Sequence, residues 1–352
     1  MSDAYLALET GRVVSARGRV PGRARGELVF TTAYTGYEES LTDPSYEEQV
    51  LTFAYPLIGN YGVRHERFES ERVHPNAVVA RELTRDVVDW LEQEDTPAID
   101  RLDTRDLVLD IRDIGAMRCG LAVGPDATPE AAEAELEACP AMSDHADIGK
   151  QVSVAEPIVI EGDGPAIALI DCGAKGSIIE SLEARDAHIT VLPYDASAAD
   201  VEAVDPSLLF ISNGPGDPKT FEAAEALVAE YAGELPIAGI CLGQQVVANA
   251  LGGATEKMEF GHRGVNQPVR DLATDKVVMT TQNHGYMVSE PGELTVTQVN
   301  VNDDTPEGLD NDDLGIITRQ YHPEAHPGPH DTLDFFDDVM ALAEGQTVAL
   351  AD

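Results

Sequence analysis

Residues 236–251, PIAGICLGQQVVANAL, combine an apolar run, a glycine-flanked cysteine and a helix-like segment. The apolar residues before Cys241 are typical of a buried strand, and the residues after it of a helix. Gly239 and Gly243 flank the cysteine in the G-x-C-x-G spacing of a nucleophile elbow, with cysteine in place of serine. Such a turn lifts the sulfur above the sheet edge and directs a helix N-terminus at it, which favours the thiolate. A buried structural cysteine is the alternative, and the strand, the helix and the two glycines favour the nucleophile.

The sequence around this elbow alternates between strand-like and helix-like segments. This alternation implies βαβ units and a mostly parallel sheet, so we predict an α/β domain over residues 166–352. Active sites in such sheets lie at the carboxyl ends of the strands. The segments expected as strands are 166–170, 188–192, 208–211, 236–240 and 316–320, and those expected as helices are 175–186, 219–231 and 242–251.

The amino-terminal part has a different texture and is predicted to be a smaller, β-rich α+β domain over residues 1–150. Short apolar runs separated by turn residues predict strands at 28–30 and 49–53. Helices are expected at 104–112, with Thr104 as a possible N-cap, and at 129–139. Residues 151–165 are polar and glycine-bearing towards their end, which favours a linker.

The composition of the 352 residues is strongly acidic, with 64 Asp and Glu against 23 Lys and Arg and a net charge of −41. This charge opposes binding to nucleic acid and to anionic membranes, while 43% hydrophobic residues argue against disorder. We find no apolar run long enough to span a membrane, no signal peptide and only four cysteines, so a reducing cytoplasm is expected. The charge far exceeds the roughly 2–8 of a small domain. It favours a halophilic protein with a solvated acidic shell over an ordinary acidic one.

A cysteine nucleophile requires a base and a group that orients the base. His322 and Glu324 follow the predicted strand at 316–320 and lie two residues apart, so an extended backbone places them on one side. We predict that His322 accepts the thiol proton and that Glu324 fixes its tautomer; a solvated histidine in a turn is the alternative. His326 and His330 continue a four-residue repeat, but the intervening prolines exclude a regular metal-binding helix. No metal site is expected.

Two glycine-bearing segments follow or separate predicted strands. Residues 212–218, SNGPGDP, lack the spacing of a phosphate-binding loop. The backbone N–H of Gly214, together with that of Leu242, could form an oxyanion hole, and a plain turn is the alternative. Residues 282–286, QNHGY, have the composition of a hairpin turn.

Three of these motifs together resemble a class I glutamine amidotransferase domain covering about residues 166–345. They are GICLGQQ at 239–245, HPE at 322–324 and SNGPGDP at 212–218. The same motifs recur in several such enzymes, so they indicate a glutaminase without indicating what accepts the ammonia.

Further segments resemble the small subunit of carbamoyl-phosphate synthetase, and this resemblance spans nearly the whole chain. The resemblance implies hydrolysis of L-glutamine to glutamate and ammonia. It also implies a heterodimer with a large subunit that makes carbamoyl phosphate from bicarbonate and ATP, for arginine and pyrimidine biosynthesis. It implies no cofactor in this chain, with ATP and Mg²⁺ in the partner. The matching segments are TGYEE at 35–39, LTDPSY at 41–46, YPLIGNYG at 55–62, FGHRGVNQPV at 260–269 and AHPGPHD at 325–331.

The resemblance also implies the roles of individual residues. It assigns the triad to Cys241, His322 and Glu324. It places the glutamine-binding positions at Ser45, Gly214, Gly216, Leu242, Gln245, Asn283, Gly285 and Tyr286. Gln244, Tyr321 and Gln267 depart from the residues common in the family. Another class I amidotransferase, a γ-glutamyl hydrolase on the same scaffold and a non-catalytic regulatory subunit remain as alternatives.

Overall fold

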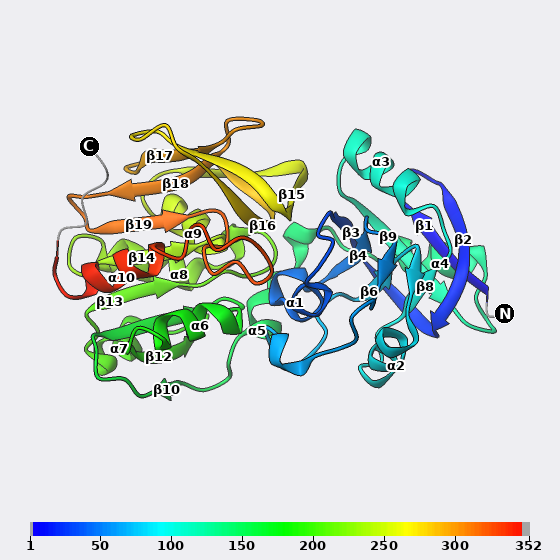
Figure 1. Cartoon of the computed structure of the whole chain (residues 1–352), viewed down its shortest axis with the longest axis horizontal. Helices are drawn as coiled ribbons and strands as arrows, with labels where there is room; N and C mark the ends of the chain where they lie inside the picture. Colours follow the sequence, from blue (N-terminus) through cyan, green and yellow to red (C-terminus); the bar gives the residue numbers. More distant parts are fainter. Residues whose placement is uncertain (1–2, 347–352) are drawn as a thin grey trace. The chain divides into compact units, whose positions relative to one another are not determined.

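The computed structural model describes residues 3–346, which divide into two compact units (Figure 1). The first unit contains residues up to 145 and a second segment, 258–264. The second unit contains 146–257 and the residues from 265 onward. The sequence patterns did not predict that 258–264 belongs with the amino-terminal residues.

Seven strands of the first unit close into a barrel in the order β1-β2-β8-β6-β4-β3-β9. Alternate residues of β1, Ala4, Leu6 and Leu8, are fully buried in the barrel core, as the period of a strand requires. A separate pair, β5 and β7, runs parallel. The bounds are β1 Asp3–Leu8, β2 Val13–Val20, β3 Gly22–Thr31, β4 Gln49–Phe53, β5 Leu57–Ile58, β6 Ala77–Val79, β7 Glu82–Leu83, β8 Ala98–Asp100 and β9 Met117–Val123.

The helices of the first unit are α1 Tyr37–Thr42, α2 Arg85–Gln93, α3 Thr104–Ile114 and α4 Pro129–Glu137, with 3₁₀ turns at Pro44–Tyr46, His65–Arg67 and Met142–Asp144. The predicted helices at 104–112 and 129–139 are confirmed, but the N-cap prediction at Thr104 is wrong. The cap is Asp103, whose carboxylate accepts from the N–H of Asp106. Thr104 is already the first helical residue, so the residue before it is the cap, and its carboxylate satisfies a free N–H group of the first turn.

The segment 258–264 contacts the barrel through both backbone and side chains. The N–H of Ala116 donates to the carbonyl of Glu259 at 2.6 Å. Phe260 packs against the apolar core of the barrel. These contacts explain why a short internal piece of the long strand β15 belongs to the first unit.

The second unit is built on a ten-stranded sheet in the order β10-β12-β11-β13-β14-β19-β18-β17-β15-β16. β12, β11, β13, β14 and β19 run parallel, and β18 and β17 continue the sheet antiparallel. β13 and β14 are buried along their whole length, as expected of strands covered on both faces. The bounds are β10 Ile158–Ile160, β11 Ala166–Asp171, β12 His188–Pro193, β13 Leu208–Ile211, β14 Ile237–Ile240, β15 Ala254–Asp271, β16 Val277–Glu290, β17 Thr295–Asn300, β18 Pro306–Asn311 and β19 Ile316–Arg319.

The α/β fold predicted for this part of the chain is confirmed. Residues of α6 and α10 join the core strands in one apolar cluster, and α8 packs against α9. Residues 282–286 lie within the continuous strand β16 and form no hairpin turn. The helices are α5 Ile148–Val152, α6 Gly176–Glu183, α7 Ala198–Val204, α8 Glu222–Tyr231, α9 Leu242–Ala250 and α10 Phe335–Ala343, with a 3₁₀ turn at Pro218–Thr220. Among the described helices, none has the length and apolar character needed to cross a membrane.

Candidate active site

The carboxyl ends of three neighbouring strands bring the predicted motifs together. β14 lies between β13 and β19, and the three strands run parallel. Cys241 directly follows β14, the glycine turn at 212–218 follows β13, and 322–324 come shortly after β19. Motifs that are far apart in the sequence therefore meet at one edge of the sheet, where active sites of such folds lie.

The turn at Cys241 has the backbone of a nucleophile elbow. Its φ of 54° and ψ of −105° are strained for a non-glycine residue. A Cβ atom at position 243 would lie 2.2 Å from the carbonyl oxygen of Ile211, and one at position 239 would lie 2.9 Å from the carbonyl carbon of Gly243. Only glycine fits this close approach of strand and helix, which explains the G-x-C-x-G spacing.

His322 and Glu324 form a buried hydrogen-bonded pair. The distance between His322 Nδ1 and Glu324 Oε1 is 2.6 Å, and both side chains are buried. The N–H of His322 donates to the carbonyl of Thr281 at 2.9 Å, which fixes the backbone. Because Nδ1 is occupied, Nε2 is the nitrogen that remains for Cys241. Within residues 3–346, Nε2 has no hydrogen-bond partner, but the Cys241 thiol is one of the groups that raise the pKa of the ring. Catalytic hydrogen bonds are often long before substrate binds.

The electrostatics of this pair favour charged forms. Burial opposes protonation of His322, but the Glu324 carboxylate and the Cys241 thiol outweigh it and raise the pKa of His322 to about 10. Burial also opposes ionisation of Glu324, but Lys175 and His322 lower its pKa to about 2. An imidazolium held by a carboxylate therefore stands beside the thiol, an arrangement that stabilises a thiolate.

Lys175 is a residue of this site that the sequence reasoning missed. Its side chain is 3% exposed. Nζ donates to Glu324 Oε1 at 2.8 Å and to the carbonyl of His326 at 3.0 Å. The sequence patterns predicted only that Lys175 begins a helix at 175–186. Its signal was its position shortly after the strand β11, at the same edge of the sheet as Cys241.

Two backbone N–H groups lie where an oxyanion hole was predicted. The N–H groups of Gly214 and Leu242 donate none of the hydrogen bonds that turns, loops and helix caps make within residues 3–346. A Cβ atom at position 214 would lie 2.2 Å from the carbonyl oxygen of Cys172 and 2.8 Å from Leu242 Cδ2. The turn that carries Gly214 therefore packs directly against the first residue of α9.

The remaining predicted glutamine-binding residues lie in the second unit, except for Ser45. Gln245 is buried on α9, where its Nε2 donates to the carbonyl of Tyr286 at 2.8 Å and to Gln320 Oε1 at 2.9 Å. Asn283, Gly285 and Tyr286 lie on β16, and the Cys241 thiol donates to the carbonyl of Asn283 at 3.7 Å. Gly216 follows β13 with a φ of 84°. Ser45 lies in the first unit, in a 3₁₀ turn where its N–H donates to Asp43 Oδ1.

Comparison with known proteins identifies both parts of the chain. Residues 168–342 match the family "Glutamine amidotransferase class-I", and residues 6–121 match "Carbamoyl-phosphate synthase small chain, CPSase domain". The carbamoyl phosphate synthase small chain of Halobacterium salinarum is 69% identical, with full coverage of both chains. That of Archaeoglobus fulgidus is 44% identical over 95% of this chain and 97% of its own length. That of Methanocaldococcus jannaschii is 42% identical over 97% of this chain and 99% of its own length. The chain belongs to the carbamoyl-phosphate synthase small chain family, and its second half is a class I glutamine amidotransferase domain.

Proposed function

We propose that this chain hydrolyses L-glutamine at Cys241 and passes the ammonia to a synthetase large subunit. The large subunit then makes carbamoyl phosphate from bicarbonate and ATP. The observation that carries this proposal is the elbow thiol of Cys241 beside an imidazole that Glu324 holds at 2.6 Å. The names of the full-length relatives, all small chains of carbamoyl phosphate synthase, support the same partner. Because the partner carries the synthetase chemistry, we assign no cofactor to this chain. The low cysteine count supports a place in the reducing cytoplasm.

The proposed reaction proceeds in two steps. The Cys241 thiolate attacks the side-chain carboxamide carbon of glutamine, and the N–H groups of Gly214 and Leu242 stabilise the oxyanion. His322 gives its proton to the leaving nitrogen, so ammonia departs and a γ-glutamyl thioester remains. His322 then takes a proton from water, which attacks the thioester and releases glutamate and the thiol.

Product analysis with and without the large subunit tests this function. The chain is incubated with L-glutamine, alone or with a synthetase large subunit, bicarbonate and ATP, and glutamate, ammonia and carbamoyl phosphate are measured. Glutamate that forms together with carbamoyl phosphate supports the proposal. Hydrolysis of γ-glutamyl peptides without any need for a partner would indicate a hydrolase instead. Inactivity under both conditions would indicate a regulatory subunit.

Replacing His322 with asparagine is expected to lower kcat for glutamine hydrolysis by about 10³-fold or more, because no group then protonates the leaving ammonia. Single-turnover kinetics should show slow formation of the thioester. His188→Asn is the matched control, since His188 lies at the start of β12 and is partly exposed, and it should retain normal activity. Normal activity in His322→Asn would remove the proposed role of His322.

Replacing Lys175 with methionine is expected to weaken catalysis by roughly 10- to 100-fold, less than the ~10⁴-fold loss of an orienting carboxylate. Among the charges that lower the pKa of Glu324, that of Lys175 has the largest effect. Its loss should therefore raise the pKa of Glu324. The acidic limb of the kcat/KM profile should therefore move to higher pH. Lys219→Met, at an exposed lysine, is the control. An acidic limb that stays at its wild-type pH would argue against this role.

A further inference from the structure

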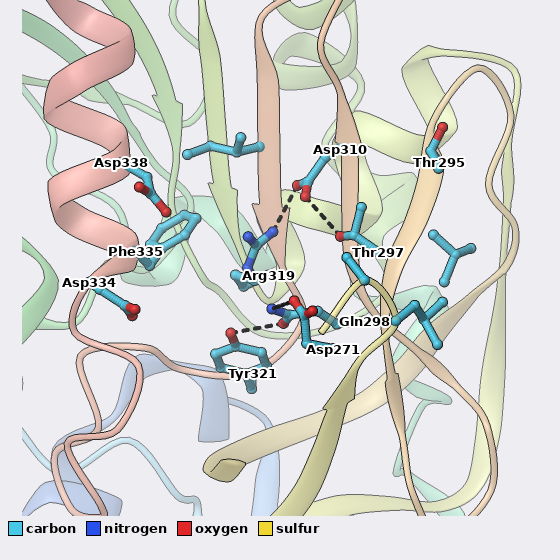
Figure 2. A pocket seen from close by; sticks show the side chains of 14 residues that line it. Asp271, Thr295, Thr297, Gln298, Asp310, Arg319, Tyr321, Asp334, Phe335 and Asp338 are labelled. Atoms are coloured by element: carbon cyan, nitrogen blue, oxygen red, sulfur yellow. Dashed lines mark hydrogen bonds and ion pairs between the residues drawn. The ribbon is translucent and has the colours of Figure 1, made fainter. Parts of the chain in front are cut away.

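The second unit contains a cavity of about 530 Å³ that is not part of the proposed glutamine site (Figure 2). Its walls come from β17, β18, β19, the end of β15 and the start of α10. The volume lies within the roughly 300–1,000 Å³ of small-molecule sites. Ile317, Val296 and Phe335 supply apolar wall, and Arg319 lies in the middle of the lining with Asp310 beside it.

Arg319 presents unused hydrogen-bond donors to this cavity. Its side chain is about nine-tenths buried, at 8% exposed for the residue. Nη1 donates to Asp310 Oδ1 and to the carbonyl of Thr318, both at 2.7 Å. The guanidinium carbon lies 5.4 Å from the ring centre of Phe335. Nε and Nη2 have no acceptor among the described residues, so a planar two-donor edge remains, which is the geometry that binds a carboxylate.

The negative charge of the cavity argues against a ligand that is only an anion. Four carboxylates line it, those of Asp271, Asp310, Asp334 and Asp338, against the single guanidinium of Arg319. Asp310 is paired with Arg319. In the described part of the chain, neither Asp334 nor Asp338 has an ion-pair partner, and their spacing of four residues places them on one side of α10. A ligand that reaches Arg319 must therefore also bring positive charge.

We propose that this cavity is a second ligand site that binds a small amino acid of net positive charge. The ligand's carboxylate accepts from Nε and Nη2 of Arg319, and its ammonium groups lie against Asp334 and Asp338. This binding lies beyond the proposed glutaminase function and does not depend on it.

Two residues that line the cavity are bonded to the proposed catalytic residues through the backbone. The carbonyl oxygen of Arg319 accepts from the N–H of Cys241 at 2.7 Å. Tyr321, whose hydroxyl donates to Gln298 Oε1 at 3.0 Å in the cavity wall, directly precedes His322. A ligand in the cavity therefore touches the side chains of residues whose backbone holds the proposed catalytic groups.

Calorimetric titration of the full chain with L-lysine tests the site, at constant KCl that keeps the chain folded. Asp334→Asn with Asp338→Asn should raise the Kd for lysine at least about tenfold. Asp312→Asn with Asp313→Asn is the matched control, because it removes the same charge from exposed residues that do not line the cavity. The control should bind lysine as the wild type does. Equal binding by both double variants, or no binding at millimolar lysine, would overturn the proposal.

Arg319→Lys tests the carboxylate contact without leaving Asp310 unpaired, because it keeps the charge and removes the two-donor edge. This variant should weaken lysine binding about tenfold. The variant should bind cadaverine, a diamine without a carboxylate, as tightly as the wild type does. In the wild type, cadaverine should bind at least about tenfold more weakly than lysine. Equal affinity for the two ligands would show simple cation attraction and would overturn the role of Arg319.

Discussion

Replacing Cys241 with serine should lower glutamine hydrolysis by about 10⁴-fold or more, as the loss of a nucleophile does in other hydrolases. The change replaces a single sulfur atom with oxygen in a residue that is 2% exposed. A serine fits the elbow, so the fold should be unchanged. Sulfur is intrinsically a much stronger nucleophile than a hydroxyl oxygen, so the serine should attack the carboxamide far more slowly. The measurement is glutamate release under saturating glutamine.

Cys172→Ser is the matched control for this variant. Cys172 is also fully buried in the second unit and directly follows β11, but its thiol lies outside the elbow. This control should keep glutaminase activity. In a complex with the large subunit, Cys241→Ser should still support carbamoyl phosphate synthesis from added ammonia, because only hydrolysis is lost. Near-normal glutaminase activity in Cys241→Ser would refute the assignment of the nucleophile.

The second large effect is expected from salt. A net charge of −41 creates strong self-repulsion in the folded chain, and ions screen exposed charges within about 10 Å at 0.1 M and about 3 Å at 1 M. The melting temperature should therefore rise with KCl into the molar range. At an unfolding entropy of about 2.1 cal/mol/K per residue, a gain of about 5 kcal/mol corresponds to roughly 7 °C for a chain of 352 residues. Thermal unfolding followed by circular dichroism in dilute and in molar KCl measures this shift.

A charge-reduced variant provides the control for the salt effect. Glu133 and Glu137 are exposed on α4, and their spacing of four residues makes them repel each other. Glu133→Gln with Glu137→Gln should melt higher than the wild type in dilute KCl and nearly equally in molar KCl. Affinity for the large subunit should also rise with salt if both subunits are acidic. A melting temperature that does not change between dilute and molar KCl would contradict the interpretation of the acidic shell.

Much of the second unit follows from local sequence because its signals act over short distances. The apolar run before Cys241 and the glycines beside it determine a strand, a tight turn and a helix within one stretch of chain. The spacing of His322 and Glu324 likewise places two side chains on one side of an extended backbone. Residues 282–286 show the limit of this reasoning, because their turn-like composition lies inside β16, where pairing along the strand outweighs local preference.

The α/β fold, the elbow and the pairing of His322 with Glu324 could be predicted from short segments, because each depends on neighbouring residues and on the period of one element. The tertiary structure sets which distant groups meet. It brought Lys175 to Glu324 across 149 positions of the chain, and it placed 258–264 in the first unit. It also enclosed Arg319 with Asp334 and Asp338 in one cavity. These contacts arise from strand order and helix packing, which no local pattern of residues encodes.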